Sequence, residues 1–260
     1  MWRDALAAWA VPPAIAATAT ESPWVPPPAP PPGPDDGGGP TRARALAALG
    51  AGGTVLDVGA GEGAASLPLT GPMIALTAVD ERGDALAELA TRAKPGLQLT
   101  LVPGRWPDVA PRVPAADVVV CAHVLYNVPD LAGFARALTR AARRLVVCEL
   151  TERHPLTALN PLWKRFHGID RPEGPTAGDA IAVLTGLGLD VGVERWSRAA
   201  SRRYGTFADR VEITRRRLCL PVERAAEVGR ALADADAAGR PERRLVTVWW
   251  AGDGELRRPG

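Results

Sequence analysis

Several residue types are scarce in this 260-residue chain, and each scarcity excludes a class of protein. The three cysteines, Cys121, Cys148 and Cys219, are too few for a disulfide scaffold and share no metal-ligand spacing. A reducing cytoplasm is therefore the expected compartment. The net charge is only +2, which excludes a globally basic nucleic-acid binder of the histone kind. No run of about 18 apolar residues occurs, so no membrane-spanning helix is expected.

Lysine is almost absent, with two residues against 29 arginines. Because alanine, glycine and proline are abundant, we interpret the arginine excess as composition bias and not as a functional signal. Residues 5–20 form an uncharged stretch, but Arg3 and Asp4 precede it and Pro12 and Pro13 interrupt it. A secretory signal needs a basic start and a continuous apolar middle, so secretion is not expected.

A proline- and glycine-rich segment divides the chain into two unequal parts. Residues 26–40 cannot hold a helix or a central strand, which predicts a linker. Before it lies a short N-terminal arm (residues 1–25) with Trp2, Trp9 and Trp24. Two interpretations remain open: a disordered tail, or an arm that docks onto the body over the active site. Residues 1–40 thus precede a domain expected at 41–260.

The domain shows apolar strand-like runs that alternate with amphipathic helical segments. This alternation predicts βαβ units, and hence an α/β fold with a doubly wound, mostly parallel sheet of seven strands. A helical insertion at about 199–242 is expected between the last two strands. The expected strands are 54–58, 73–79, 97–102, 116–122, 143–150, 189–196 and 243–251, and the expected helices include 41–49, 131–142, 177–187, 206–218 and 221–236.

A glycine-rich loop follows the first predicted strand. Gly59, Gly61 and Gly63 stand where the backbone must turn tightly, and a helix is expected to start directly after them. Ligands of open α/β sheets bind at this carboxyl edge of the strands. The spacing alone also fits a dinucleotide site, so a nicotinamide-dependent oxidoreductase is one alternative.

Acidic residues around the loop argue for a different ligand. Asp57 precedes the glycines and Glu62 lies within them, and both would repel a pyrophosphate at the helix start. They favour a ligand that carries positive charge. Asp80, at the end of the second strand, is placed to accept hydrogen bonds from ribose hydroxyls. A positively charged ligand with a ribose is S-adenosyl-L-methionine.

The chain resembles the class I S-adenosylmethionine-dependent methyltransferases, which have a Rossmann-like fold. The resemblance rests on residues 55–63, 78–86 and 116–131, and it covers about residues 41–150. It implies that Asp57 lies near the cofactor ammonium. The chain departs from the family where many members have an acid that binds adenine, since Gly104, Arg105 and Trp106 stand there; stacking of Trp106 on adenine, or an acid supplied by Asp108, is expected instead. The implied cofactor-binding residues are Asp57, Gly59, Ala60, Gly61, Gly63, Asp80, Glu81, Arg105, Trp106, Ala122 and His123.

The candidate general bases come from the segments after the fourth and fifth strands. The catalytic candidates are His123, His167 and Glu149. Histidine most often serves as a base near neutral pH, and Glu149, at the end of the fifth strand, is a further candidate base. His154 is the third histidine and is a weaker candidate. The residues expected to bind the acceptor are Tyr126, Asn127, Trp163 and Arg165.

The preferred function is methyl transfer to a small or medium-sized organic acceptor. Residues 195–217 carry eight arginines and two acids, which keeps RNA or protein methylation open as an alternative. A protein that binds the cofactor without catalysis is a further alternative. No metal is expected, because no cluster of His, Asp or Glu has ligand spacing. The oligomeric state stays open.

Overall fold

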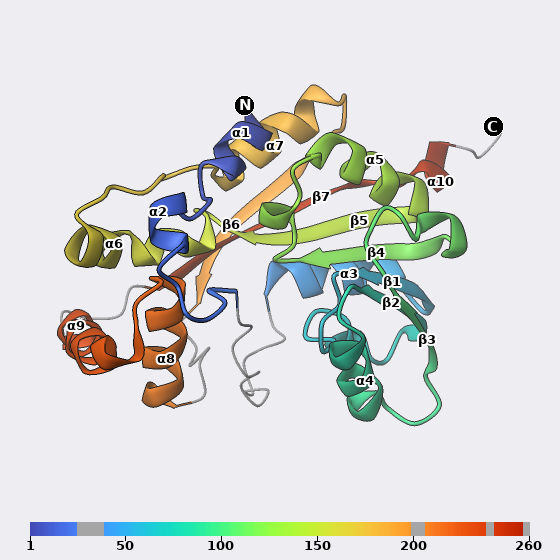
Figure 1. The fold of residues 1–260 in the computed structure, drawn as a ribbon. Coiled ribbons are helices and arrows are strands. Elements are labelled where there is room, and N and C mark those ends of the chain that lie inside the picture. Colours follow the sequence, from blue (N-terminus) through green and yellow to red (C-terminus); the bar gives the residue numbers. More distant parts are fainter. Residues whose placement is uncertain (25–38, 199–205, 238–241, 257–260) are drawn as a thin grey trace.

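The computed structural model describes residues 1–24, 39–198, 206–237 and 242–256. At the centre of these residues is a seven-stranded sheet with the order β3-β2-β1-β4-β5-β7-β6 (Figure 1). Strands β1 to β5 pair in parallel, whereas β7 runs antiparallel between β5 and β6. The predicted α/β fold with a mostly parallel sheet is therefore confirmed. The strands are β1 (Gly53–Val58), β2 (Met73–Asp80), β3 (Gln98–Pro103), β4 (Ala116–Ala122), β5 (Ala142–Thr151), β6 (Gly192–Arg198) and β7 (Arg243–Ala251).

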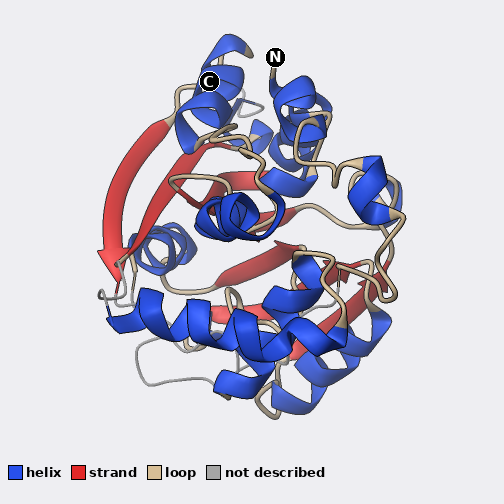
Figure 2. Ribbon diagram, turned by 60° about the vertical axis from the view of Figure 1, so that its left-hand side comes forward, coloured by secondary structure: helices blue, strands red, loops and turns tan. Residues whose placement is uncertain are grey.

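The central strands are apolar on both faces because helices cover both faces of the sheet (Figure 2). In β4, Val119 and Cys121 pack into the core on one face, and Val118 and Val120 pack into the core on the other. All four side chains are at most 1% exposed. This two-sided burial explains why these strands are continuous apolar runs in the sequence.

Helices α1, α5 and α7 cover one face of the sheet, and α3 and α4 cover the other (Figure 1). Helices α6, α8 and α9 form a third, smaller apolar cluster beyond the ends of β5 and β6. The helices are α1 (Trp2–Ala7), α2 (Pro13–Ala16), α3 (Pro40–Leu49), α4 (Gly83–Arg92), α5 (Leu131–Ala141), α6 (Asn160–His167), α7 (Ala177–Gly186), α8 (Phe207–Arg217), α9 (Ala225–Ala237) and α10 (Asp253–Leu256).

One expected helix is replaced by a tighter structure. The sequence predicts a helix directly after Gly63, but the structure has turns followed by a single 3₁₀ turn, Leu67–Leu69. Pro68 lacks a backbone N–H and disfavours the helical conformation of Leu67 before it. β2 begins at Met73, so too few residues remain for a regular helix.

The excursion between β6 and β7 is helical, as the periodicity of the sequence indicates. Leu218 and Val228, from the α8–α9 region, pack against Leu162 and Trp163 of α6. Between the two helices, Arg210 forms an ion pair of 2.7 Å with Asp236. The insertion therefore packs against α6, in the segment that follows β5.

The N-terminal arm lies along the segments that follow β4 and β5. Trp2 and Trp9 are 7% and 5% exposed, whereas Trp24 is 61% exposed. Trp2 Nε1 donates to Val128 O at 2.8 Å, and Trp9 Nε1 donates to Gly174 O at 2.6 Å. The structure thus favours the docked arm over a disordered tail for the described residues. The linker predicted at 26–40 lies mostly outside them.

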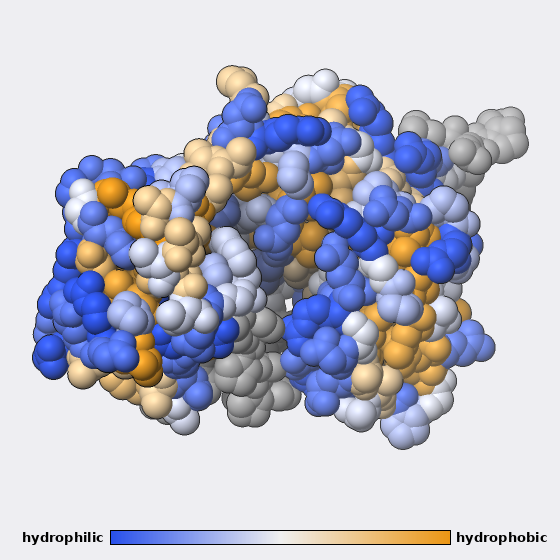
Figure 3. All heavy atoms as spheres, in the orientation of Figure 1, coloured by the Kyte–Doolittle hydropathy of each residue, from blue (hydrophilic) through white to orange (hydrophobic). Residues whose placement is uncertain are grey.

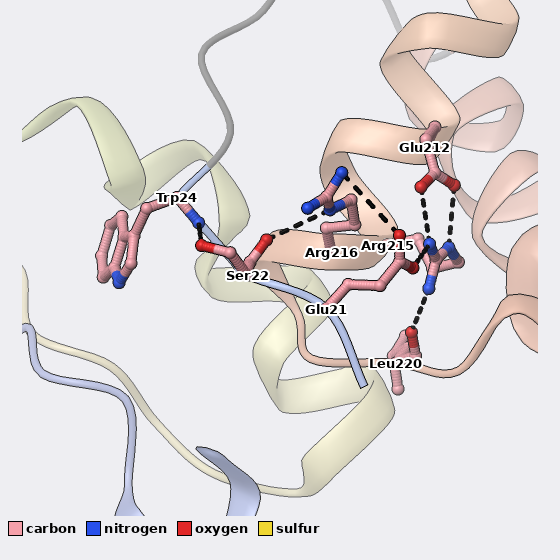
Figure 4. A network of polar contacts seen from close by, with 7 residues as sticks. All are labelled: Glu21, Ser22, Trp24, Glu212, Arg215, Arg216 and Leu220. Atoms are coloured by element: carbon pink, nitrogen blue, oxygen red, sulfur yellow. Dashed lines mark hydrogen bonds and ion pairs between the residues drawn. The ribbon is translucent and has the colours of Figure 1, made fainter. Parts of the chain in front are cut away.

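The end of the arm is tied to α8 by a charged network (Figure 4). Arg215, only 2% exposed, forms an ion pair with Glu21 and donates to Glu212 and to Leu220 O. Arg216 Nε donates to Ser22 O at 3.1 Å.

In the described part of the chain, no helix combines the length and the apolar character needed to cross a membrane.

Candidate active site

The glycine loop leaves β1 at the carboxyl edge of the sheet, and its first glycine permits a close approach. Gly59 has φ 73°, and a Cβ atom there would lie 2.2 Å from Val124 Cγ2. The loop after β4 can therefore lie directly against the loop after β1. Both Gly59 N and Ala60 N donate to Val79 O, so these two amides are used within the fold.

Gly61 occupies the open side of the same loop. Its φ is 51°, and a Cβ atom built on it would meet nothing within 4 Å. By contrast, a Cβ on Gly63 would lie 2.7 Å from Leu67. The three glycines therefore have different functions: two allow protein packing, and Gly61 leaves space where a ligand can approach the backbone.

Asp80 lies beside this open position. Its Oδ2 accepts a hydrogen bond from Gly61 N and its Oδ1 accepts one from Arg82 N, each at 2.8 Å. A carboxylate oxygen has two acceptor sites, so each oxygen retains one for a further donor. Neighbouring hydroxyls of a ribose provide two such donors at a matching spacing. The site therefore fits a ribose next to the glycine loop.

Asp57 is a fully buried carboxylate in β1, and neither of its oxygens has a hydrogen-bond partner among the described residues. Burial raises the pKa of Asp57 to about 7; the nearby Ser66 hydroxyl opposes this rise, and the charge of Asp80 adds to it. An unpaired buried carboxylate is unfavourable, and a cationic ligand nearby would stabilise its ionised form. Asp57 therefore fits a positively charged ligand and disfavours a pyrophosphate.

The remaining predicted cofactor residues lie around β2, β3 and β4. Trp106 is 6% exposed and packs in the core, and its Nε1 is buried without a partner in the described structure. Arg105 and Glu81 form a largely exposed ion pair at 3.5 Å. Ala122 ends β4 and leads into His123. The indole N–H of Trp106 is thus the group here that needs an acceptor.

His123 and Glu149 come together across the edge of β4 and β5. His123 N donates to Glu149 O at 2.7 Å, and His123 Nε2 lies 3.1 Å from Glu149 Oε1. His123 has φ 61°, a left-handed conformation that is uncommon outside glycine and that occurs often at functional sites. Because Val124 touches Gly59, this histidine stands next to the glycine loop.

Two side chains of opposite charge approach Nε2 of His123. Arg243 Nη2 also approaches His123 Nε2, at 3.3 Å. A guanidinium only donates and a carboxylate only accepts, so Nε2 cannot bond to both in one protonation state. The contact with Glu149 is the shorter of the two, and it is a hydrogen bond when Nε2 carries a proton.

The carboxylate of Glu149 is held in its ionised form by its neighbours. Burial pushes the pKa of Glu149 upward, but His123, the Thr41 hydroxyl and the charge of Arg198 together hold that pKa below its ordinary value. Thr41 Oγ1 donates to Glu149 Oε2 at 2.8 Å. The carboxylate is therefore ionised at neutral pH, and its Oε1 is placed to accept a hydrogen bond from His123 Nε2.

His167 lies in another part of the molecule. It ends α6, its ring packs on Trp163 at a centroid distance of 4.9 Å, and its Nε2 donates to Leu218 O at 2.7 Å. These contacts belong to the apolar cluster of α6, α8 and α9. The structure therefore pairs Glu149 with His123 and places the third catalytic candidate apart.

The predicted acceptor residues are divided between packing and surface. Tyr126 is 5% exposed and donates to Thr151 O at 2.8 Å, and burial raises its pKa. Trp163 is also buried, whereas Asn127 is exposed and Arg165 forms a surface ion pair with Asp234. These four side chains do not converge on one point in the described contacts.

Sequence reasoning missed Thr41, Thr247 and Arg243, which surround Glu149 and His123. A weak signal exists for one of them, since Thr247 interrupts an otherwise apolar run in β7. Thr41 gives no signal, because a threonine in the first turn of a helix is ordinary. These residues become visible only when β7 and α3 are placed beside β5.

Comparison with known proteins agrees with this geometry. Residues 56–147 match the family described as "Methyltransferase domain". No curated protein matches the chain. Among solved structures, the YcgJ protein from Bacillus subtilis is similar, with 14% identity, a TM-score of 0.52, and coverage of 84% of this chain and 100% of that chain.

A second similar structure is a SAM-dependent methyltransferase from Thiobacillus denitrificans in complex with S-adenosyl-L-homocysteine. It has 21% identity and a TM-score of 0.51, and the match covers 84% of this chain and 92% of that chain. These two likenesses support the fold, while the family match and the glycine loop with Asp57 and Asp80 support the chemistry. Residues 56–147 of the chain are therefore a methyltransferase domain with a Rossmann-like fold, for which S-adenosyl-L-methionine is the cofactor.

Proposed function

We propose that this methyltransferase modifies an oxygen or nitrogen nucleophile of a small or medium-sized organic acceptor, with His123 as the general base. The observation that carries the proposal is the His123–Glu149 pair at 3.1 Å, on a loop that touches the glycine loop through Val124 and Gly59. The side chain of His123 is 27% exposed, so the imidazole is open to the site, while the side chain of Glu149 behind it is 12% exposed.

Each residue has a defined task in this proposal. Bound S-adenosyl-L-methionine supplies an electrophilic methyl carbon, and its sulfur keeps the electron pair of the broken bond. His123 Nδ1 accepts the acceptor proton as the nucleophile bonds to that carbon. Glu149 holds the Nε2 proton and stabilises the imidazolium, which then releases its proton to solvent. Asp80 would hold the ribose and Asp57 would face the ammonium.

The ion pairs of helix α8 weaken the case for an RNA acceptor. Of the eight arginines in 195–217, Arg210 pairs with Asp236, and Arg215 and Arg216 are held by Glu21 and Glu212 or by backbone oxygens. Paired guanidinium groups release few counterions on binding a phosphate backbone. Arg202 and Arg203 lie outside the described residues.

The arm supports an enclosed acceptor site. Trp2 donates a hydrogen bond to Val128, after β4, and Trp9 donates one to Gly174, after β5. The arm thus connects the segments that follow the strands of His123 and Glu149. Figure 3 shows this face hollowed between the lobe of α6, α8 and α9 and the lobe of α4. We propose that the arm and residues 151–176 close over the acceptor and exclude water.

Titration calorimetry tests the cofactor site first. S-adenosyl-L-methionine and S-adenosyl-L-homocysteine should bind, and Asp80→Ala should weaken both, while NAD and NADP should not bind. Binding of NAD instead would contradict the charge argument from Asp57.

Transfer of a labelled methyl group tests the acceptor and the base. We expect label in a panel of small hydroxylated and amine compounds, and none in total RNA. Loss of the base should lower kcat by about 100-fold in His123→Gln. His167→Gln is the matched control, since that histidine bonds to a backbone carbonyl, and it should keep its kcat. Unchanged turnover in His123→Gln, or label only in RNA, would contradict the proposal.

A further inference from the structure

Glu149 is the end point of a largely buried chain of hydrogen bonds. Trp196 Nε1 donates to Thr247 Oγ1 at 3.1 Å, and Thr247 Oγ1 lies 2.7 Å from Thr41 Oγ1. Thr41 Oγ1 in turn lies 2.8 Å from Glu149 Oε2. The chain joins β6, β7, the first turn of α3, and β5, which are four separate elements.

All the hydrogen bonds in this series donate in the same direction. An indole N–H can only donate and an ionised carboxylate can only accept, so both ends are defined. The Thr41 hydroxyl must give its one proton to Glu149, and the Thr247 hydroxyl must therefore give its proton to Thr41. Each hydroxyl accepts one bond and donates one, so every proton in the chain points toward Glu149.

The surroundings make these hydroxyls effective. Thr247 is fully buried and Thr41 is 7% exposed, and Thr247 lies between apolar neighbours in β7. In such a low-dielectric environment a hydrogen bond to a charged group is stronger than in water, and chains of bonds polarise one another. The chain therefore stabilises the negative charge on Oε2, while Oε1 faces His123.

Gly39 allows this chain of hydrogen bonds to form. A Cβ on this residue, which precedes α3, would lie 2.3 Å from the Trp196 ring. The start of α3 therefore packs directly on the indole whose N–H begins the chain. This close approach brings Thr41, two residues later, to Thr247 and Glu149.

We propose that Thr41 and Thr247 are positioning residues that hold Glu149 ionised and aimed at the Nε2 proton of His123. The inference rests on the proposed function, in which His123 is the base. It predicts that the catalytic tautomer depends on a helix outside the glycine loop and outside the acceptor segments.

Isosteric substitutions test this role. Thr41→Val and Thr247→Val each remove one hydroxyl and keep the volume, whereas Thr41→Ser keeps the hydroxyl. Loss of a hydrogen bond to a charged group should lower kcat about tenfold in Thr41→Val, with KM for the cofactor unchanged. The acid limb of the pH–kcat profile should move to higher pH, and Thr41→Ser should restore most of the rate.

Thr139→Val is the matched control. Its Oγ1 is buried and accepts the Trp250 indole N–H at 2.8 Å, which copies the Trp196–Thr247 contact in α5, away from the base. It should lose stability as the other valine variants do, but its pH–kcat profile should stay that of the wild type. A shift in this control as large as that in Thr41→Val would overturn the proposal.

Nitrogen NMR of labelled histidine gives a readout without any acceptor. With three histidines in the chain, His123 can be assigned by substitution. Wild type should show the Nε2–H tautomer, and Thr41→Val should show a mixture. An unchanged tautomer and pH profile in Thr41→Val would overturn the positioning role, even where His123→Gln is inactive. Full activity in His123→Gln would instead overturn the proposed function itself.

Discussion

Val124 occupies the space that a Cβ atom on Gly59 would need. The distance from such an atom to Val124 Cγ2 would be 2.2 Å, so the loop after β4 rests directly on the loop after β1. His123 immediately precedes Val124, and Gly61 follows Gly59 by two residues. The glycine therefore sets the separation between the cofactor loop and the proposed base.

Gly59→Ala should consequently disturb both loops. The φ of 73° is strained for alanine, and the methyl group would displace Val124, so a loss of roughly 2–4 kcal/mol in unfolding free energy is expected. Gly96→Ala is the control, because its φ is 86° but nothing lies within 4 Å of its Cβ. It should lose only about 1 kcal/mol. Denaturant unfolding of the two variants compares them, and equal losses would show that the Val124 contact is unimportant.

Cofactor affinity should rise with pH through neutrality. With the pKa of Asp57 near 7, its ionised fraction grows about tenfold between pH 6 and pH 8, and only the ionised form attracts the ligand's ammonium. Calorimetric titration of S-adenosyl-L-homocysteine should show a matching gain in affinity. Asp57→Asn should bind more weakly and lack this component of the pH dependence. An identical pH profile in the variant would mean that Asp57 does not face the ammonium.

Acid should destabilise the docked arm through His154. This histidine stacks on Trp9 at a centroid distance of 4.1 Å, and burial lowers its pKa to about 4. Between pH 6.5 and pH 4, His154 is protonated in the unfolded chain but stays neutral in the folded chain. Stability is therefore lost as the pH falls through this window, by about 3 kcal/mol in total.

Comparison with His154→Phe isolates this contribution. Phenylalanine can keep the stacking on Trp9 but has no proton to bind, so the difference in unfolding free energy between the two proteins should change with pH from 6.5 to 4. A constant difference would show that His154 takes up its proton in the folded state as readily as in the unfolded one.

The network at the end of the arm should contribute measurably to stability. Arg215→Met removes a guanidinium that is 2% exposed and leaves Leu220 O without its donor. Because the partner acids are 41% and 45% exposed, the expected loss is only about 2 kcal/mol. Arg153→Met is the control, since its ion pair with Glu173 is 66% exposed on both sides. Chemical denaturation should leave that control close to wild type; equal losses would contradict a special role for the arm network.

The sequence alone was sufficient for the fold and for the cofactor. The apolar runs that became β1, β4 and β5 are continuous because helices cover both faces of the sheet, and this pattern is local in the sequence. The glycines and the acids Asp57 and Asp80 are likewise close along the chain, so their chemistry could be interpreted before any packing was known. The helix expected after Gly63 failed because Pro68 has a stronger local effect than the general pattern.

Only the tertiary structure decided which residues meet. His123, His167 and Glu149 were equivalent candidates in the sequence, and the register of β4 with β5 placed Glu149 opposite Ala122, beside His123. Thr41 and Thr247 are 206 residues apart, and only the packing of α3 on the β5–β7 pair joins them. Such contacts depend on strand order and helix placement, which arise from burial over the whole chain. Local sequence patterns therefore determine the elements and the cofactor loop, while the global fold determines the polar partners of the proposed base.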